Sequence, residues 1–365
     1  MIGNQGFSFD ISETKTIIIT GASGYVGRHV VNRFLKEGYD LIVTTRKAKN
    51  LEKFDWSSQV HICEVDITDP SSWCAEFERS SGLIHLAWPG LSNFRDDSHV
   101  DQAFPASLDF LERIAQIGVE HILVTGTCLE YGLSQGQISS DQATSPQIPY
   151  AIAKDLLNKK LKELSVRYGF TLQWARLFYS FGSGQSESSI IPLFLAAIRE
   201  NKDRFDMSMG QQLRDYLPIE AVAQQIFDLY QSKQTGDFNI CRGTPISVKQ
   251  LIQEFRDRYQ SSIELNLGAY PYPDYEPLKF WGKRDIPERV YLPALPNAPE
   301  REWSNNSVLG LMSLRRNIDT GFFENAAFDA SCIDYTEGYE NSQGHSEKFK
   351  SHFAILQGGF FYAVD

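Results

Sequence analysis

The sequence lacks the features that mark membrane, secreted and nucleic-acid-binding proteins. It contains no run of about 18 apolar residues, the length that a helix needs to cross a membrane. Residues 1–14 are polar and hold no apolar segment of the kind found in signal peptides. Basic side chains are the minority, 35 Lys and Arg against 46 Asp and Glu, and a net charge of -11 disfavours non-specific binding to nucleic acid. We therefore expect neither a membrane nor nucleic acid among the partners.

Cysteine is scarce and scattered. Five cysteines occur in 365 residues, and no two of them have the spacing of a metal site or a redox motif. They are Cys63, Cys74, Cys128, Cys241 and Cys332. An odd number of dispersed thiols favours a reducing compartment over a disulfide framework. We therefore predict a cytoplasmic protein without a metal site. The length of 365 residues is a separate constraint, and it allows two domains or one large domain with an appendage.

Glycine is concentrated in one turn. Residues 17–20, Ile-Ile-Ile-Thr, are typical of a buried parallel strand, and an amphipathic stretch ending at Gly38 follows the turn. Gly21 permits a tight turn, Gly24 lets backbone N–H groups approach a pyrophosphate, and Gly27 allows helix and strand to pack closely. We predict a dinucleotide site here, with a plain turn between strand and helix as the alternative. Its predicted cofactor-binding residues are Gly21, Ser23, Gly24, Tyr25, Val26 and Gly27.

The second predicted strand, residues 41–44, ends without an acidic residue. An acid there usually binds the ribose 2′-hydroxyl of NAD. The sequence continues with Thr45-Arg46-Lys47, and a cation suits the 2′-phosphate of NADP. We therefore favour NADP(H), with Arg46 as its ligand, and NAD(H) stays open. The alternative without a cofactor role is a solvated basic loop.

A third predicted strand, residues 60–65, runs into Asp66-Ile67. An acid in this position can face the amino group of adenine, so we predict that both residues contact the cofactor. Asp66 could equally cap the turn that begins at Asp69, and the sequence leaves these two roles open.

The predicted strand at residues 121–125 ends in Thr125-Gly126-Thr127. Ligands of open parallel sheets bind outside the carboxyl ends of the strands, where a hydroxyl can bond a substrate carbonyl oxygen. Thr127 is the candidate, with Thr125 as a near neighbour. A structural role at the strand end is the alternative.

Tyr150 and Lys154 lie four residues apart in a helix predicted over 150–168. This spacing puts both side chains on one face, one turn from each other. An ammonium close to a phenol favours the phenolate, so the hydroxyl can exchange protons below its ordinary pKa of about 10. The pair therefore predicts acid–base chemistry on a carbonyl or alcohol, against the alternative of a core tyrosine beside a solvated lysine.

The regular alternation of strands and helices loosens after Phe178. We predict a Rossmann-type doubly wound α/β domain over 14–180, to which later segments return, a smaller substrate-binding lobe over 181–285, and an irregular extension over 286–365. Arg214 is the candidate phosphate ligand of the lobe, because arginine binds phosphate through two parallel hydrogen bonds. The alternative is an internal ion pair with Asp215 or a charge at a helix end.

Three motifs occur in order on the expected elements: Thr20-Gly21-x-x-Gly24-x-x-Gly27, Thr127 before Tyr131-Gly132, and Tyr150-x-x-x-Lys154. Over about residues 14–285 the chain resembles the extended short-chain dehydrogenase/reductase superfamily, the NAD-dependent epimerase/dehydratase family. The resemblance implies that Tyr150 is the catalytic acid/base, that Lys154 lowers its pKa and holds the nicotinamide ribose, and that Thr127 binds the reacting oxygen. It further implies that Arg214 contacts the sugar-nucleotide diphosphate. The cofactor would be lined by Leu86, Ala87 and Thr125, and the substrate by Trp88.

The resemblance also bears on the reaction. Family members that act as 4,6-dehydratases place Asp-Glu directly after the catalytic Thr, whereas Cys128-Leu129 follow here, which disfavours water elimination. The stretches 86–90, 126–132 and 272–277 are similar to those of NDP-4-keto-6-deoxyhexose reductases from surface-polysaccharide clusters. The expected activity is thus NADP(H)-dependent reduction of the 4-keto group of a nucleotide-linked 6-deoxy sugar, as in deoxysugar and polysaccharide biosynthesis. The alternatives are a 4-epimerase that retains NAD(P) and a non-catalytic NADP-binding regulator.

Two further expectations follow from resemblance. Relatives are often dimers through helices like the one that bears Tyr150, so we expect a homodimer. Residues 328–353 are faintly similar to a segment of sugar-modifying methyltransferases, but no Gly-rich methyl-donor site follows. We interpret the extension as the remnant of a fused methyltransferase and assign it no activity.

Overall fold

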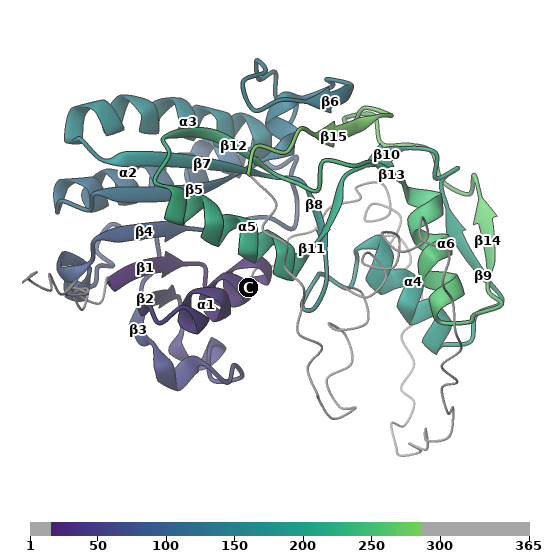
Figure 1. Ribbon diagram of the computed structural model, residues 1–365, viewed down its shortest axis with the longest axis horizontal. Helices are drawn as coiled ribbons and strands as arrows, with labels where there is room; N and C mark the ends of the chain where they lie inside the picture. The colour runs from purple at the N-terminus through teal and green to yellow at the C-terminus, as the bar shows by residue number, and fades with distance from the viewer. Residues whose placement is uncertain (1–15, 287–365) are drawn as a thin grey trace, which may run out of the picture.

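The computed structural model describes residues 16–286, and a parallel sheet of seven strands forms its larger part (Figure 1). The strands lie in the order β12–β7–β5–β4–β1–β2–β3. Their bounds are β1 Thr16–Thr20, β2 Asp40–Thr45, β3 His61–Glu64, β4 Gly82–His85, β5 His121–Thr127, β7 Thr171–Leu177 and β12 Gly236–Ile240. The chain winds outward in both directions from the β1–β4 pair, which confirms the predicted doubly wound α/β class. The switch point, where such sheets bind ligands, is between β1 and β4.

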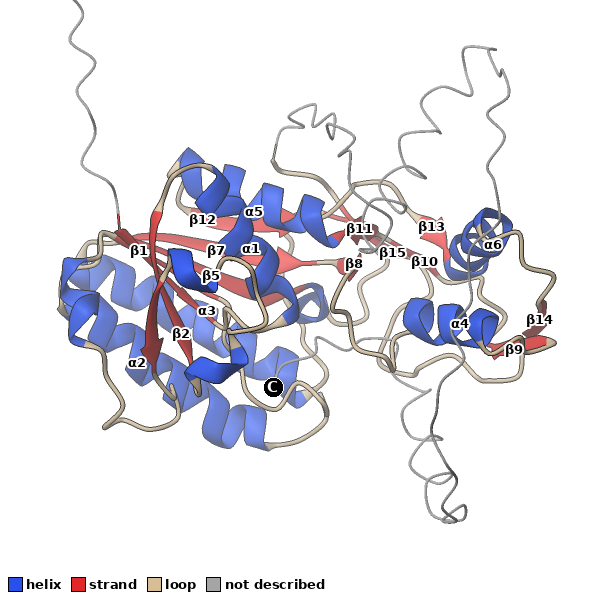
Figure 2. Cartoon of the chain, turned by 90° about the horizontal axis from the view of Figure 1, so that it is seen from below, coloured by secondary structure: helices blue, strands red, loops and turns tan. Residues whose placement is uncertain are grey.

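Helices cover both faces of this sheet (Figure 2). α1 (Tyr25–Lys36) and α5 (Ile219–Ser232) pack on one face, and α2 (Phe104–Gln116) and α3 (Pro149–Tyr168) pack on the other. Successive strand residues point to opposite faces. Ile17 and Ile19 therefore join the core under α1 and α5, while Ile18 joins the core under α2 and α3. This two-sided burial explains why the strand reads as a continuous apolar run.

A smaller lobe lies at one end of the sheet (Figure 1). Its elements are β6 Gly136–Ile138, β8 Tyr179–Phe181, α4 Ile190–Arg199, β9 Arg204–Met207, β10 Leu213–Arg214, β11 Tyr216–Pro218, β13 Ile246–Ser247, α6 Val248–Arg258, β14 Glu264–Leu267 and β15 Phe280–Gly282. The strands pair two by two, as β6 with β15, β8 with β11, β9 with β14 and β10 with β13. Within the predicted lobe range 181–285, α5 and β12 belong to the main sheet layer, so the lobe is built from segments on either side of this return.

Short helical turns complete the described chain. They are η1 Ala48–Asn50, η2 Ser57–Gln59, η3 Ala75–Arg79, η4 His99–Ala103 and η5 Cys128–Tyr131. Within residues 16–286, no helix has both the length and the hydrophobicity that crossing a membrane requires. The predicted extension, apart from Ile286, lies outside the described residues, and so does its similarity to methyltransferases.

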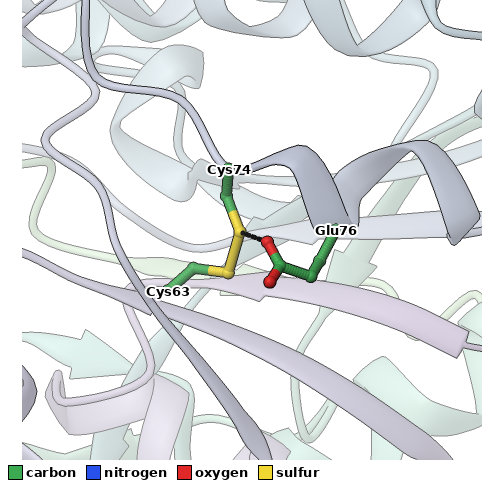
Figure 3. Close-up of side chains that lie close together, drawn as sticks. All are labelled: Cys63, Cys74 and Glu76. Carbon is green, nitrogen blue, oxygen red and sulfur yellow. Dashed lines mark hydrogen bonds between the residues drawn. A yellow bond between two sulfur atoms is a disulfide. The ribbon is translucent and has the colours of Figure 1, made fainter.

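A disulfide corrects the expectation drawn from the cysteines. Cys63 on β3 and Cys74 just before η3 are joined, with their Cα atoms 6.2 Å apart, and Glu76 lies beside the bond (Figure 3). No sequence motif marks this pair, because the fold, not the spacing along the chain, brings the two residues together. The bridge removes the cysteine-based argument for a reducing compartment. Both sulfur atoms are engaged in it, so this trio supplies no thiolate to a metal.

Candidate active site

The glycine turn between β1 and α1 is shaped to receive a phosphate group. Gly24 precedes α1 without a side-chain cap, so the first N–H groups of the helix have no side-chain acceptor from it. These donors and the helix dipole favour an anion. Gly21 has φ of +69°, and a Cβ there would lie 2.8 Å from the Ala87 nitrogen, while a Cβ on Gly27 would lie 2.0 Å from the Gly21 oxygen. Only glycine fits at these two places, as the sequence predicts.

Thr20 fixes the end of β4 beside this turn. Its Oγ1 accepts the backbone N–H groups of Leu86 and Ala87, each at 3.1 Å, and lies 3.0 Å from Nδ1 of His85. A hydroxyl that accepts twice donates its own proton to the imidazole, so Nδ1 is the acceptor. Burial lowers the pKa of His85 to about 3, so the ring is neutral and serves this local structure.

One cavity joins the glycine turn to the predicted catalytic pair. It is lined by Gly21, Gly24, Tyr25, Val26, Gly27, Leu86, Trp88, Leu91, Thr125, Gly126, Tyr150, Lys154 and Leu177. Most of these residues follow or end β1, β4, β5 and β7, at the carboxyl edge of the sheet. The sequence did not single out Leu91, Gly126 or Leu177. Gly126 could have been found, because it lies at the end of the predicted strand at residues 121–125.

Tyr150 is held by aromatic neighbours in the first turn of α3. Its ring centroid lies 5.2 Å from that of Phe94, 5.3 Å from that of His99 and 6.1 Å from that of Trp88. The backbone N–H of Tyr150 donates to the Phe94 oxygen at 3.1 Å. The loop after β4 therefore fixes the position of the phenol at the cavity, and Tyr150 itself is only 4% exposed to solvent.

Lys154 is buried one turn further along α3. Its Nζ donates to the Thr125 carbonyl at 2.9 Å and lies 4.0 Å from the centroid of the Trp88 ring. The Trp88 indole N–H in turn donates to Nδ1 of His99 at 3.1 Å, which fixes the ring under the ammonium. Burial lowers the pKa of Lys154 to about 7, and the charge of Glu130 opposes this shift. The alternative of a solvated lysine is therefore wrong.

Thr127 lies behind the cavity rather than among its lining residues. Its Oγ1 accepts the N–H of Leu129 at 3.3 Å and so caps η5. A hydroxyl that accepts in this way keeps its proton available for donation. Thr125, two residues earlier on the same face of β5, does line the cavity.

Arg46 and Asp66, the residues predicted to bind the adenosine half of the cofactor, do not line this cavity. Arg46 is exposed after β2. Asp66 Oδ1 accepts the backbone N–H of Thr68 at 2.9 Å, so this carboxylate forms the local turn. Glu64 on β3 accepts the N–H of Ala48 at 2.5 Å. An acid from the neighbouring strand therefore lies beside the end of β2, which a search within β2 alone could not find.

The remaining predicted cofactor residues outside the cavity lining are Ser23, Ile67 and Ala87. Ser23 lies in the glycine turn, where its carbonyl accepts from Arg28 at 3.3 Å. Ile67 is half-buried against the core under α2 and α3. Ala87 is half-buried after β4.

Arg214 is paired inside the lobe, but not with Asp215. Its Nη2 lies 2.8 Å from Oε2 of Glu276. The Asp215 carboxylate instead accepts the backbone N–H groups of Arg242 and Gly243, at 2.6 and 2.8 Å. The predicted alternative of an ion pair with the next residue is wrong in its partner, because the Asp215 carboxylate, between β10 and β11, is taken by the backbone of residues 242–243.

Comparisons with known proteins identify the family and the fold. The model of the family described as "NAD dependent epimerase/dehydratase family" matches residues 17–241. The dTDP-6-deoxy-L-talose 4-dehydrogenase (NAD(+)) of Aggregatibacter actinomycetemcomitans is 30% identical over 269 residues, which cover 73% of this chain and 99% of the relative. The dTDP-4-dehydro-6-deoxyglucose reductase of Escherichia coli is 23% identical over 253 residues, which cover 65% and 79%. The structure of UDP-glucuronic acid 4-epimerase from Bacillus cereus, in complex with UDP-glucuronic acid and NAD, has a TM-score of 0.63 at 20% identity, covers 74% of this chain and 90% of that one, and supports the fold.

Proposed function

The chain belongs to the NAD-dependent epimerase/dehydratase family of extended short-chain dehydrogenases/reductases, and from this premise we propose that it reduces the 4-keto group of a nucleotide-linked 6-deoxy sugar. Two relatives are named for redox chemistry at C4 of the sugar. One is a 4-dehydrogenase and the other is a 4-dehydro-sugar reductase, so their names describe oxidation and reduction at the same carbon. The residues after Thr127, Cys128 and Leu129, do not supply the acids of a dehydratase.

The observation that carries the proposal is the cavity shared by the glycine turn and the Tyr150–Lys154 pair. Its residues fit a nicotinamide dinucleotide. The uncapped start of α1 would hold the pyrophosphate, and the places where Gly21 and Gly27 lack a Cβ let the backbone come close. Lys154 would hold the nicotinamide ribose. When bound, the dinucleotide supplies the hydride that the C4 carbonyl accepts.

The side chains of this protein handle the proton. Tyr150 donates its hydroxyl proton to the C4 oxygen as negative charge develops there. The Thr127 hydroxyl, which lies behind the cavity lining and keeps its proton free while it accepts from Leu129, would donate a hydrogen bond to the same oxygen once the substrate reaches the end of β5. Lys154 in its charged form favours the phenolate that Tyr150 leaves behind. The aromatic rings of Phe94 and Trp88 keep the phenol away from bulk water.

The proposal extends to the cofactor and the setting. NADP(H) is the preferred form because Arg46 and Lys47 are exposed at the end of β2. The related 4-dehydrogenase carries NAD(+) in its name, so both forms belong in the assay. We place the enzyme in deoxysugar biosynthesis for polysaccharides, as a cytoplasmic homodimer with a nucleotide-sugar substrate.

The test is incubation with dTDP- and UDP-linked 4-keto-6-deoxy sugars in the presence of NADPH or NADH. Stoichiometric loss of nicotinamide absorbance, with formation of the 4-hydroxy sugar, supports the reductase. A parallel incubation supplies UDP-glucose, which has a C4 hydroxyl, and its conversion to the C4 epimer without net change in nicotinamide absorbance supports a 4-epimerase, the rival that the epimerase relatives favour. Cofactor binding without turnover of any sugar in the panel supports the non-catalytic regulator.

A further inference from the structure

A buried ionic network lies behind the end of β5. Glu130 in η5 is fully buried, and its Oε1 accepts the backbone N–H of Thr127 at 2.8 Å. Its Oε2 accepts from Nε of Arg176 at 2.6 Å and from Nε1 of Trp174 at 3.0 Å. A carboxylate without solvent is costly unless it is paired and hydrogen-bonded, and here every bond is to a fixed donor. The carboxylate is therefore held in one place.

Glu130 and Lys154 flank the same strand end. Lys154 Nζ donates to the Thr125 carbonyl, and a Cβ added to Gly126 would lie 2.5 Å from Glu130 Oε1. The carboxylate thus packs against the backbone between the two threonines, while the ammonium bonds the residue before it. No part of Glu130 lines the cavity, so its influence on chemistry there acts through Thr127 and Lys154.

The network also reaches the helix that carries the catalytic pair. Arg176 Nη2 donates to Oδ2 of Asp237 at 3.0 Å. Asp237 accepts from Asn158 at 3.3 Å and from Lys162 at 2.9 Å, and both of these residues are on α3. The chain of contacts runs from the Thr127 backbone through β7 and β12 to α3. It therefore ties together the two segments that carry the proposed hydroxyl and the proposed acid.

We propose that Glu130 is a positioning residue for this site: it holds the Thr127 backbone and keeps a fixed negative charge beside Lys154. Its effect on turnover rests on the proposed function, whereas its effect on dinucleotide binding needs no sugar substrate.

The charges around Lys154 show what Glu130 adds. Burial lowers the pKa of Lys154, and Glu130 is the group that raises it again. Two histidines also face the ammonium, His85 from β4 and His99 from η4. Burial lowers the pKa of both rings, which leaves them uncharged at neutral pH. Removing the Glu130 charge should therefore shift the loss of the Lys154 proton to lower pH.

The experiment measures the dissociation constant of NADPH and of NADH from pH 5.5 to 9 in the wild type, Glu130→Gln and Lys154→Met. In the wild type, affinity should fall as pH rises through about 7, and Lys154→Met should lack this step. In Glu130→Gln the step should move down by about one pH unit, because a neighbouring buried charge commonly shifts a pKa by that much. With an active sugar substrate, kcat should also fall by about 10-fold. A step at the wild-type pH in folded Glu130→Gln overturns the proposal.

Asp215→Asn is the matched control. It makes the same change, a buried carboxylate to an amide, at a site whose carboxylate bonds Arg242 and Gly243 instead. Its pH step should stay at the wild-type position. If Glu130→Gln does not fold, Glu130→Asp keeps the charge and withdraws it by one methylene. That variant should retain the wild-type step and lose about 10-fold in kcat, and an unchanged kcat overturns the positioning role. If no sugar turns over in the wild type, the proposed function fails while the binding step still decides the role of Glu130.

Discussion

Arg214 and Glu276 form a buried ion pair, with Nη2 and Oε2 2.8 Å apart and side chains 3% and 4% exposed. The pair joins β10 to the loop at residues 271–277, between β14 and β15. The guanidinium charge is therefore already balanced. The role that family resemblance implies for Arg214, contact with a substrate diphosphate, is left to the guanidinium N–H groups that Glu276 does not engage.

Arg214→Met should lower the free energy of unfolding by about 3–5 kcal/mol, because it leaves the Glu276 carboxylate buried without its partner. Adding Glu276→Leu should recover much of this loss, since both charges are then gone. Urea unfolding measures both values. Arg204→Met is the control, because its contact with Asp206 is at 3.8 Å and its side chain is 68% exposed. Equal losses in the two single variants would contradict the assignment.

Tyr150→Phe should abolish turnover and leave the dissociation constant of the dinucleotide within about twofold. The variant keeps the ring that packs on Phe94 and loses only the hydroxyl that donates the proton. Steady-state kinetics and a binding titration give the two readouts. Tyr168→Phe, on the same helix but with its hydroxyl bonded to Glu112 at 3.0 Å, should keep full activity. Undiminished turnover in Tyr150→Phe would contradict the role of Tyr150 as the proton donor.

The charge of Lys154 should affect activity and stability in opposite directions. Its pKa is lowered to about 7 in the folded protein, below the ordinary value of 10.5. Between these two values the unfolded chain binds a proton that the folded protein does not, so stability is highest above about pH 10, falls as pH drops from about 10 to 7, and changes no further below 7. Activity needs the cation and should instead fall as pH rises through about 7.

The measurement compares wild type with Lys154→Met. The variant has no proton to lose, so its advantage in free energy of unfolding should grow as pH falls from 10 to 7. The pH profile of kcat/KM measures the predicted fall in activity as pH rises through about 7. A stability difference between the two proteins that does not change with pH would show that Lys154 titrates normally.

The fold and the centre of the site could be read from local pattern. β1, the glycine turn and α1 follow from a β-branched run, three glycines and an amphipathic stretch, each visible within a few residues. Tyr150 and Lys154 follow from helical spacing. Glu276, Glu64 and the partner of Cys63 could not be found in this way. Each acts on a residue of another element, and only the fold brings the two together.

Arg46→Ala should raise the KM for NADPH by about 10-fold and leave the KM for NADH nearly unchanged, because an arginine–phosphate contact is worth about 1.4 kcal/mol or more. Initial-rate kinetics with each cofactor test this. Lys49→Ala removes another exposed cation from the same loop and should change neither value much. An equal loss for both cofactors would contradict a 2′-phosphate contact and favour an NAD site in which Glu64 faces the ribose.

Reducing the Cys63–Cys74 disulfide should destabilise the protein by about 3 kcal/mol, because the bridge closes a short loop with a sequence separation of 11 in the unfolded chain. The loop contains Asp66 and Ile67, so dinucleotide affinity should fall together with stability if these residues face the adenine. Urea unfolding with and without a thiol reductant measures the first effect, and a binding titration measures the second. Cys63→Ser should resemble the reduced wild type and show no further response to reductant. An unfolding midpoint that reductant leaves unchanged in the wild type would show that the bridge contributes nothing to stability.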